Sequence, residues 1–322
     1  MPSLTASKIP PSDLEKAIIS TLLYYDLLDC PLTALEIFKY LSYQKNNVSF
    51  FRLRENLKQS VFLNAACESD QGLYFLKDRG KLVNQREKKL KISQIKWKRL
   101  KAAARPLAFI PFLRLADVSG SLTFHNANEQ SDFDLLIITQ NNRLWTARIL
   151  IMAVLGIMGK RRHGSHTKNR FCLNCYLTEN NLEIKKENKI RDMHSSQEYG
   201  RLTLLLEKKT GLHAEFLENN NWLKKFLNNY PWPNCQTAKR ISVSRLAQKI
   251  SRLAEKILSG YWGDQIEKKL GDWQTKRIKA KTKNEPTDQI FCSNSCLMFH
   301  PQSKSYSLME KYDKRMQEIH NF

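Results

Sequence analysis

The sequence contains little glycine and proline and lacks any long hydrophobic run. Only 11 Gly and 10 Pro occur among the 322 residues, which excludes collagen-like and low-complexity chains. The longest apolar run, residues 149–159, has eleven residues, whereas a membrane-spanning helix needs about 20. The first twelve residues contain no apolar core of the kind that defines a signal peptide. We therefore expect neither a membrane span nor a membrane partner.

Acidic residues are also scarce relative to basic ones. The chain has 31 Asp and Glu against 53 Lys and Arg, a formal net charge of +22. A field of this size favours polyanionic partners such as nucleotides, nucleic acid or an acidic membrane surface. The seven cysteines are an odd number spread over a long chain, which is typical of a reducing compartment rather than a disulfide scaffold. We expect a cytoplasmic protein of about two domains.

Residues 1–80 are predicted to form a helical unit that ends in a β-hairpin. Capping boxes at residues 12–15 and 33–36 indicate two helix starts, and Ser49 begins a third helix. The hairpin strands are expected at residues 61–65 and 73–76.

Three helices followed by a hairpin resemble a winged helix. That resemblance implies nucleic-acid binding through the third helix, with Arg52, Arg54 and Lys58 as the contacts. The unit has nine basic and nine acidic residues, however, which is unlike the basic footprint of a DNA-binding domain. The charge balance therefore favours a packing or protein-partner role for this unit, with nucleic-acid binding as the alternative.

Two further regions are predicted to be helical. Residues 81–105 contain ten Lys and Arg against one acid, Glu87, and form a basic connecting helix. Residues 191–322 are mainly helical, because apolar residues recur at helical spacing over residues 243–257 and again over 266–273. Each region has a net charge of +9, and the 81–105 helix is the better candidate for contact with a polyanion.

Residues 106–190 have a different pattern, which is typical of a mixed α+β domain. Strand-like runs occupy residues 113–119, 133–139 and 171–178, and a helix over 143–158 separates the last two. A hairpin is expected after the third strand, with Asn180-Asn181 as its turn and 182–185 as its returning strand. The predicted fold class is α+β, with a mixed sheet here, a winged-helix-like unit before it and a helical region after it.

Two acidic residues lie in the most apolar of these strands. Asp132 and Asp134 are two residues apart, so their side chains project from the same face, whereas Phe133, Leu135 and Ile137 project into a core. Two carboxylates placed in this way can hold Mg²⁺ together with substrate phosphates. Upstream, Gly120 allows a close backbone approach, and Ser121 offers a hydroxyl to phosphate oxygens.

Gly-Ser, ten residues, and then Asp-x-Asp in an apolar strand resembles the polymerase-beta-like nucleotidyltransferase superfamily. The resemblance covers residues 106–190, about a quarter of the chain. It implies that Gly120 and Ser121 position a nucleoside triphosphate (NTP), and that Asp132 and Asp134 bind Mg²⁺ or Mn²⁺. The implied reaction transfers a nucleoside monophosphate to an unknown acceptor and releases pyrophosphate. The alternative interpretation is a strand end with two solvated aspartates.

The sequence departs from the family at the third carboxylate of active members. Asn174 stands where that acid is expected on the third strand, and a neutral amide cannot act as a general base. If Asn180-Asn181 is a two-residue turn, Glu187 pairs with Asn174 and supplies the missing acid. Otherwise the domain is a weak or inactive nucleotide sensor, coupled to nucleic-acid binding by the winged-helix-like unit. Both functions stay open at this point.

Overall fold

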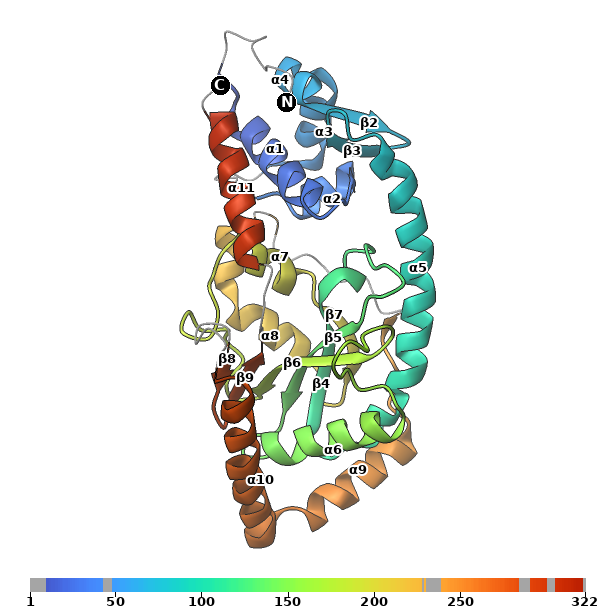
Figure 1. The fold of residues 1–322 in the computed structure, drawn as a ribbon, viewed down its shortest axis with the longest axis vertical. Coiled ribbons are helices and arrows are strands. Elements are labelled where there is room, and N and C mark those ends of the chain that lie inside the picture. Colours follow the sequence, from blue (N-terminus) through green and yellow to red (C-terminus); the bar gives the residue numbers. More distant parts are fainter. Residues whose placement is uncertain are drawn as a thin grey trace.

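The computed structural model describes residues 10–42, 48–227, 229, 239–283, 290–299 and 305–320. Along the longest axis of the molecule, a helical unit built from the N-terminal residues is followed by a mixed β-sheet with helices around it (Figure 1). Helix α5 (Lys81–Ala104) runs along one side and connects the two parts. The fold is α+β, as the sequence predicts.

The N-terminal unit consists of short helices and a small antiparallel sheet. Both predicted capping boxes are confirmed, because the Ser12 and Thr33 side chains accept from the Glu15 and Glu36 amides and the glutamates bond back. The helices are α1 (Asp13–Asp26), α2 (Ala34–Lys39), α3 (Phe50–Gln59) and α4 (Val61–Ala66). The strands, in the spatial order β1-β3-β2, are β1 (Leu32–Thr33), β2 (Cys67–Asp70) and β3 (Leu73–Leu76).

The prediction of a strand over residues 61–65 is wrong, because this segment forms helix α4. The Ser60 hydroxyl accepts from the Leu63 amide at 3.1 Å and so caps a new helix directly after α3. Phe62 and Leu63 are buried. The strand that pairs with β3 starts six residues later than predicted, at Cys67. A local cap thus outweighs the strand propensity of a short apolar run.

Helix α5 is the predicted basic helix, but two of its cations point inward and bind other segments. The Arg86 guanidinium pairs with Glu36 at 2.6 Å and donates to the Phe124 carbonyl at 2.9 Å. Lys96 is almost fully buried, and its Nζ donates to the Ser131 carbonyl at 2.7 Å and to Asn169 Oδ1 at 2.9 Å. Lys96 therefore fixes the backbone immediately before Asp132.

The central sheet contains the three predicted strands β4 (Leu113–Val118), β5 (Phe133–Thr139) and β6 (Phe171–Thr178). Helix α6 (Leu144–Ile157) connects β5 to β6, which are parallel, whereas β4 and β5 are antiparallel. The side chains of β5 alternate between two cores. Leu135 and Ile137 pack into one core as predicted, and Leu136 and Ile138 pack into the other.

The predicted hairpin after β6 is not formed, and residues 179–192 contain no strand. The antiparallel neighbour of β6 is instead β9 (Cys296–Phe299), which continues to β8 (Ile290–Cys292). On the other side, β7 (Thr203–Glu207) pairs with β4. The order is β7-β4-β5-β6-β9-β8, so the sheet extends past the predicted boundary at residue 190. The buried residues Cys296 to Met298 fit beside β6, whereas the charged 183–187 segment keeps most of its side chains in solvent.

The remaining helices pack around the sheet and against the N-terminal unit. Among the described residues, no helix combines the length and the apolar composition that a membrane span requires. The last helix returns to the N-terminal unit (Figure 1), where Arg315 pairs with Asp26 at 2.9 Å and the Tyr312 and Ser20 hydroxyls meet at 2.5 Å. These helices are α7 (Met193–Gly200), α8 (Leu212–Asn219), α9 (Arg245–Ile257), α10 (Gly260–Lys281) and α11 (Ser305–His320).

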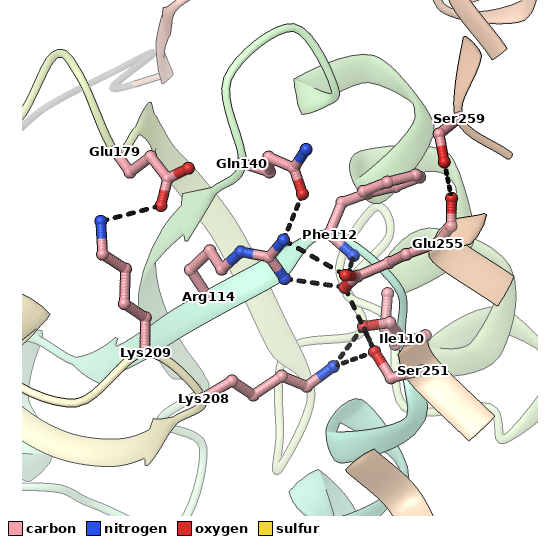
Figure 2. Close-up of polar contacts among 10 residues, drawn as sticks. All are labelled: Ile110, Phe112, Arg114, Gln140, Glu179, Lys208, Lys209, Ser251, Glu255 and Ser259. Carbon is pink, nitrogen blue, oxygen red and sulfur yellow. Dashed lines mark hydrogen bonds and ion pairs between the residues drawn. The ribbon is translucent and has the colours of Figure 1, made fainter. Parts of the chain in front are cut away.

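Helix α9 is attached to the sheet domain by polar contacts (Figure 2). The Glu255 carboxylate accepts from the Phe112 amide at 2.8 Å and from Arg114 Nη1 at 2.7 Å. One turn earlier, Ser251 Oγ accepts from Lys208 Nζ at 2.8 Å. Burial raises the pKa of Glu255, but Arg114 and the Phe112 amide outweigh burial and hold that pKa below its ordinary value.

We predict that Glu255→Ala lowers the free energy of unfolding by about 2 kcal/mol at neutral pH, because Arg114 and the Phe112 amide lose a half-buried partner. Since the pKa of Glu255 is lowered on folding, this stabilisation is present above the unfolded-state pKa and is lost as the pH falls through the folded-state value. Urea denaturation at pH 7 and at about pH 3 measures both effects. Glu218→Ala, at an exposed glutamate of α8, is the control. Equal losses from the two variants would contradict the prediction.

Candidate functional site

The two aspartates of the sequence motif lie side by side at the start of β5. Asp132 immediately precedes the strand and Asp134 is its second residue, next to Cys172 of the parallel strand β6. One ligand atom from each of these three residues lies within 4.8 Å of the other two. All three side chains are partly accessible. The arrangement can hold a cation between two strands.

Gly120 lies directly against Asp134. Its φ of +70° is a left-handed value that glycine adopts without strain, and a Cβ at this position would overlap Asp134 Oδ2. The neighbouring Ser119 amide donates to the Asp134 carbonyl at 3.0 Å. Ser121 follows in the 3₁₀ turn η2 (Gly120–Leu122), which Thr123 closes by donating to the Gly120 carbonyl. The structure thus brings Gly120 and both aspartates together, and Ser121 follows Gly120 in the chain.

The two candidates for the third acid behave differently. Asn174 lies at the site, where its Nδ2 donates to Asp134 Oδ1 at 3.4 Å. Glu187 lies in an exposed segment without strand structure, and the hairpin register that was expected to bring it opposite Asn174 does not exist. The prediction for Glu187 is therefore wrong. Among the described residues, the cluster at Asp132 and Asp134 contains a thiol but no third carboxylate.

The electrostatics of the cluster reflect two like charges in a partly closed space. Burial, followed by the negative charges of Asp132 and Glu198, raises the pKa of Asp134 to about 7. Burial, followed by the negative charges of Asp134 and Asp132, raises the pKa of Cys172 to about 12, so this side chain is a neutral thiol at neutral pH. The site therefore gains stability from any cation that lies between the two carboxylates.

The site residues predicted from the sequence do not include two charged neighbours of the acid pair. Arg162 Nη1 pairs with Asp132 Oδ2 at 2.6 Å and contacts Cys172 Sγ at 3.4 Å. Glu198 lies in α7, acts on Asp134 through its charge, and pairs with Lys189 at 2.5 Å. The basic run at residues 160–162 was a signal for Arg162. No signal pointed to Glu198, because only the packing of α7 brings it into range.

A pocket of about 480 Å³ opens beside the cluster. Asp134, Cys172 and Asn174 form part of its lining, and Arg148, Arg161 and Arg162 line it as well. The Arg148 guanidinium lies over the rings of Tyr176 and Phe299 at 5.7 and 5.4 Å, which fixes its direction. The pocket therefore combines one acid of the pair, Asp134, with three cationic groups, which is a suitable environment for a phosphorylated ligand with a divalent cation.

The ligand types at the cluster favour a hard cation. Mg²⁺ and Mn²⁺ bind carboxylate and amide oxygens, which Asp132, Asp134 and Asn174 offer. Structural zinc sites combine several thiolates and imidazoles, whereas this cluster offers one thiol and no described histidine. Asp132 and Asp134 therefore fit Mg²⁺ or Mn²⁺ better than zinc.

No family model, curated protein or solved structure matches this chain. The defining features of the site are the Gly120–Asp134 approach, the paired aspartates and the arginine-lined pocket.

We predict that Gly120→Ala abolishes divalent-cation binding, because the new methyl group displaces the Asp134 carboxylate. The control is Gly72→Ala, since Gly72 has a similar φ of +77° with no atom near its Cβ position. Both variants lose about 1 kcal/mol of stability through backbone strain. Titration calorimetry with Mn²⁺ and thermal unfolding separate the two effects. Equal Mn²⁺ affinity in the two variants would show that the close approach has no role in binding.

Proposed function

We propose that this chain is a Mg²⁺- or Mn²⁺-dependent nucleotidyltransferase, which transfers a nucleoside monophosphate from an NTP to an acceptor hydroxyl. The main support is the contact between Gly120 and Asp134, because it places a small-residue turn directly beside a pair of carboxylates. A triphosphate requires such a turn for its oxygens and a bound cation for its charge. The pocket with Arg148, Arg161 and Arg162 adds positive charge beside the same point.

Each residue of the proposed site has a separate task. Asp132 and Asp134 would hold the cation, which when bound neutralises phosphate charge and activates the acceptor hydroxyl. The turn at Gly120 and Ser121 would orient the phosphates through backbone amides and a hydroxyl. Arg162, which is paired with Asp132, would exchange that partner for a phosphate oxygen. The chemistry then depends on positioning and on charge neutralisation.

We expect Asp132→Asn and Asp134→Asn to abolish cation-dependent NTP turnover, because each removes one of the two anionic ligands. Turnover is measured with labelled NTPs, Mg²⁺ or Mn²⁺ and a panel of acceptors. The matched control is Glu129→Gln, since Glu129 lies in the preceding loop and its exposed side chain is 3.8 Å from Lys168. Equal product yields from wild type and either aspartate variant would exclude the proposed reaction at this site.

A second candidate function is nucleotide binding with little or no turnover. It is favoured by Asn174 and Cys172, which occupy the β6 positions beside the aspartates with neutral side chains. The N-terminal unit, whose order of elements is similar to a winged helix, would then couple nucleotide binding to nucleic acid. Its third helix exposes Arg52, Arg54 and Lys58 to solvent, which is consistent with that role.

Asn174→Asp distinguishes the two candidates. For the enzyme, an added carboxylate next to Asp134 is expected to raise turnover at saturating Mn²⁺ about tenfold or more, because it strengthens the hold on the cation and can accept a proton. For the binding module, NTP binding is measurable by calorimetry, while turnover is absent in the wild type and stays absent in the variant. Asn174→Leu, which provides neither charge nor amide, is the control.

A further inference from the structure

The orientation of helix α9 is opposite to that expected for an amphipathic helix. Its inward side is polar, because Ser251 and Glu255 face the sheet domain and bind Lys208 and Arg114 (Figure 2). On the same inward side, the small apolar residue Ala247 is fully buried. The helix is thus fixed by hydrogen bonds and an ion pair, while its large apolar side chains are exposed.

The large apolar side chains of α9 point into solvent. Leu246, Ile250, Leu253 and Ile257 are 62%, 44%, 61% and 70% exposed, and their spacing of three or four residues makes one continuous stripe. At the start of α10, Tyr261 and Trp262 are 69% and 76% exposed. Single exposed apolar residues are ordinary on a protein surface. A continuous row of them, here at one end of the molecule (Figure 1), indicates an interaction surface.

A row of cations lies along the same helix beside the apolar stripe. Arg245, Lys249, Arg252 and Lys256 are all exposed, and their spacing puts them on the arc next to Leu246 and Leu253. The acidic residue of α9, Glu255, faces inward and is paired with Arg114. Over residues 239–283 the chain has thirteen Lys and Arg against four Asp and Glu. The outward side of α9 is therefore apolar along one arc and cationic along the next.

We propose that the outward side of α9 binds the surface of an anionic phospholipid membrane, with Leu246, Ile250, Leu253 and Ile257 inserted between the headgroups. Helices that lie in the membrane interface have this combination of an apolar stripe, flanking Lys and Arg, and nearby Trp or Tyr. Their cations attract anionic headgroups, and aromatic side chains such as Trp262 and Tyr261 are favoured at the boundary. This inference is independent of the nucleotide site.

Other occupants fit this surface less well. In a symmetric pairing of two copies, the four cations of one α9 would face the four cations of the other, and the repulsion would oppose association. A nucleic acid would satisfy the cations but would leave four aliphatic side chains in water. A helix that spans a membrane needs about 20 apolar residues, but this length does not limit a helix that lies on the membrane surface.

The test is co-sedimentation of the full chain with phospholipid vesicles. We expect binding to phosphatidylcholine vesicles that contain about one third phosphatidylglycerol, weaker binding to pure phosphatidylcholine, and a loss of affinity as the salt concentration rises. Leu253→Gln/Ile257→Gln should lower the partition coefficient about tenfold or more through lost apolar insertion. Lys249→Gln/Lys256→Gln should lower it by a similar factor and should weaken its salt dependence.

Val61→Gln/Ile157→Gln is the matched control, because these two side chains are 68% and 89% exposed on other helices. Circular dichroism and thermal unfolding confirm that each variant folds, which is expected because all six positions are exposed. Vesicle binding that is absent in the wild type, or unchanged in Leu253→Gln/Ile257→Gln, overturns the proposal. A dimer in light scattering that the same double variant dissociates, without vesicle binding, assigns the stripe to a second copy instead and also overturns it.

Discussion

The close packing of Gly120 against the carboxylate of Asp134 is the constraint on which the site depends. The backbone reaches the carboxylate only because position 120 has no Cβ and adopts a positive φ. That approach joins the turn after β4 to the start of β5, and the parallel register of β5 and β6 adds Cys172 and Asn174 to the same place. A small-residue turn, two acids and a neutral amide thus share one small volume.

The charge of this chain is distributed differently from what its total suggests. Several of its cations bind inside the molecule: Lys96 fixes the backbone before Asp132, Arg86 joins α5 to the N-terminal unit, and Lys208 contacts α9. Burial lowers the pKa of Lys96 and that of Lys208, the latter to about 8. A net charge of +22 therefore overstates the positive surface available to a polyanion.

Helix α9 illustrates how polar contacts can fix the direction of an amphipathic helix. Its apolar residues recur at helical spacing, a pattern that would ordinarily turn them toward a core. Glu255 and Ser251 bind groups of the sheet domain instead, and these contacts rotate the stripe outward. The amphipathic pattern of α9 therefore places apolar and cationic side chains next to each other on the exposed side of the helix.

Local patterns in the sequence were sufficient for the helix caps at Ser12, Thr33 and Ser49, for the strands β4 to β6, and for the common face of Asp132 and Asp134. Each of these depends on residues within a few positions of one another, so period and capping determine them. Tertiary structure decided the partner of β6, the inward side of α9 and the nearness of Arg162 and Glu198 to the acid pair. These features join segments far apart in the chain, and their free energy comes from packing and charge pairing that no local pattern contains. For the same reason Glu187 could not be placed by counting residues, because β9 offers β6 a more apolar neighbour than the segment that follows it.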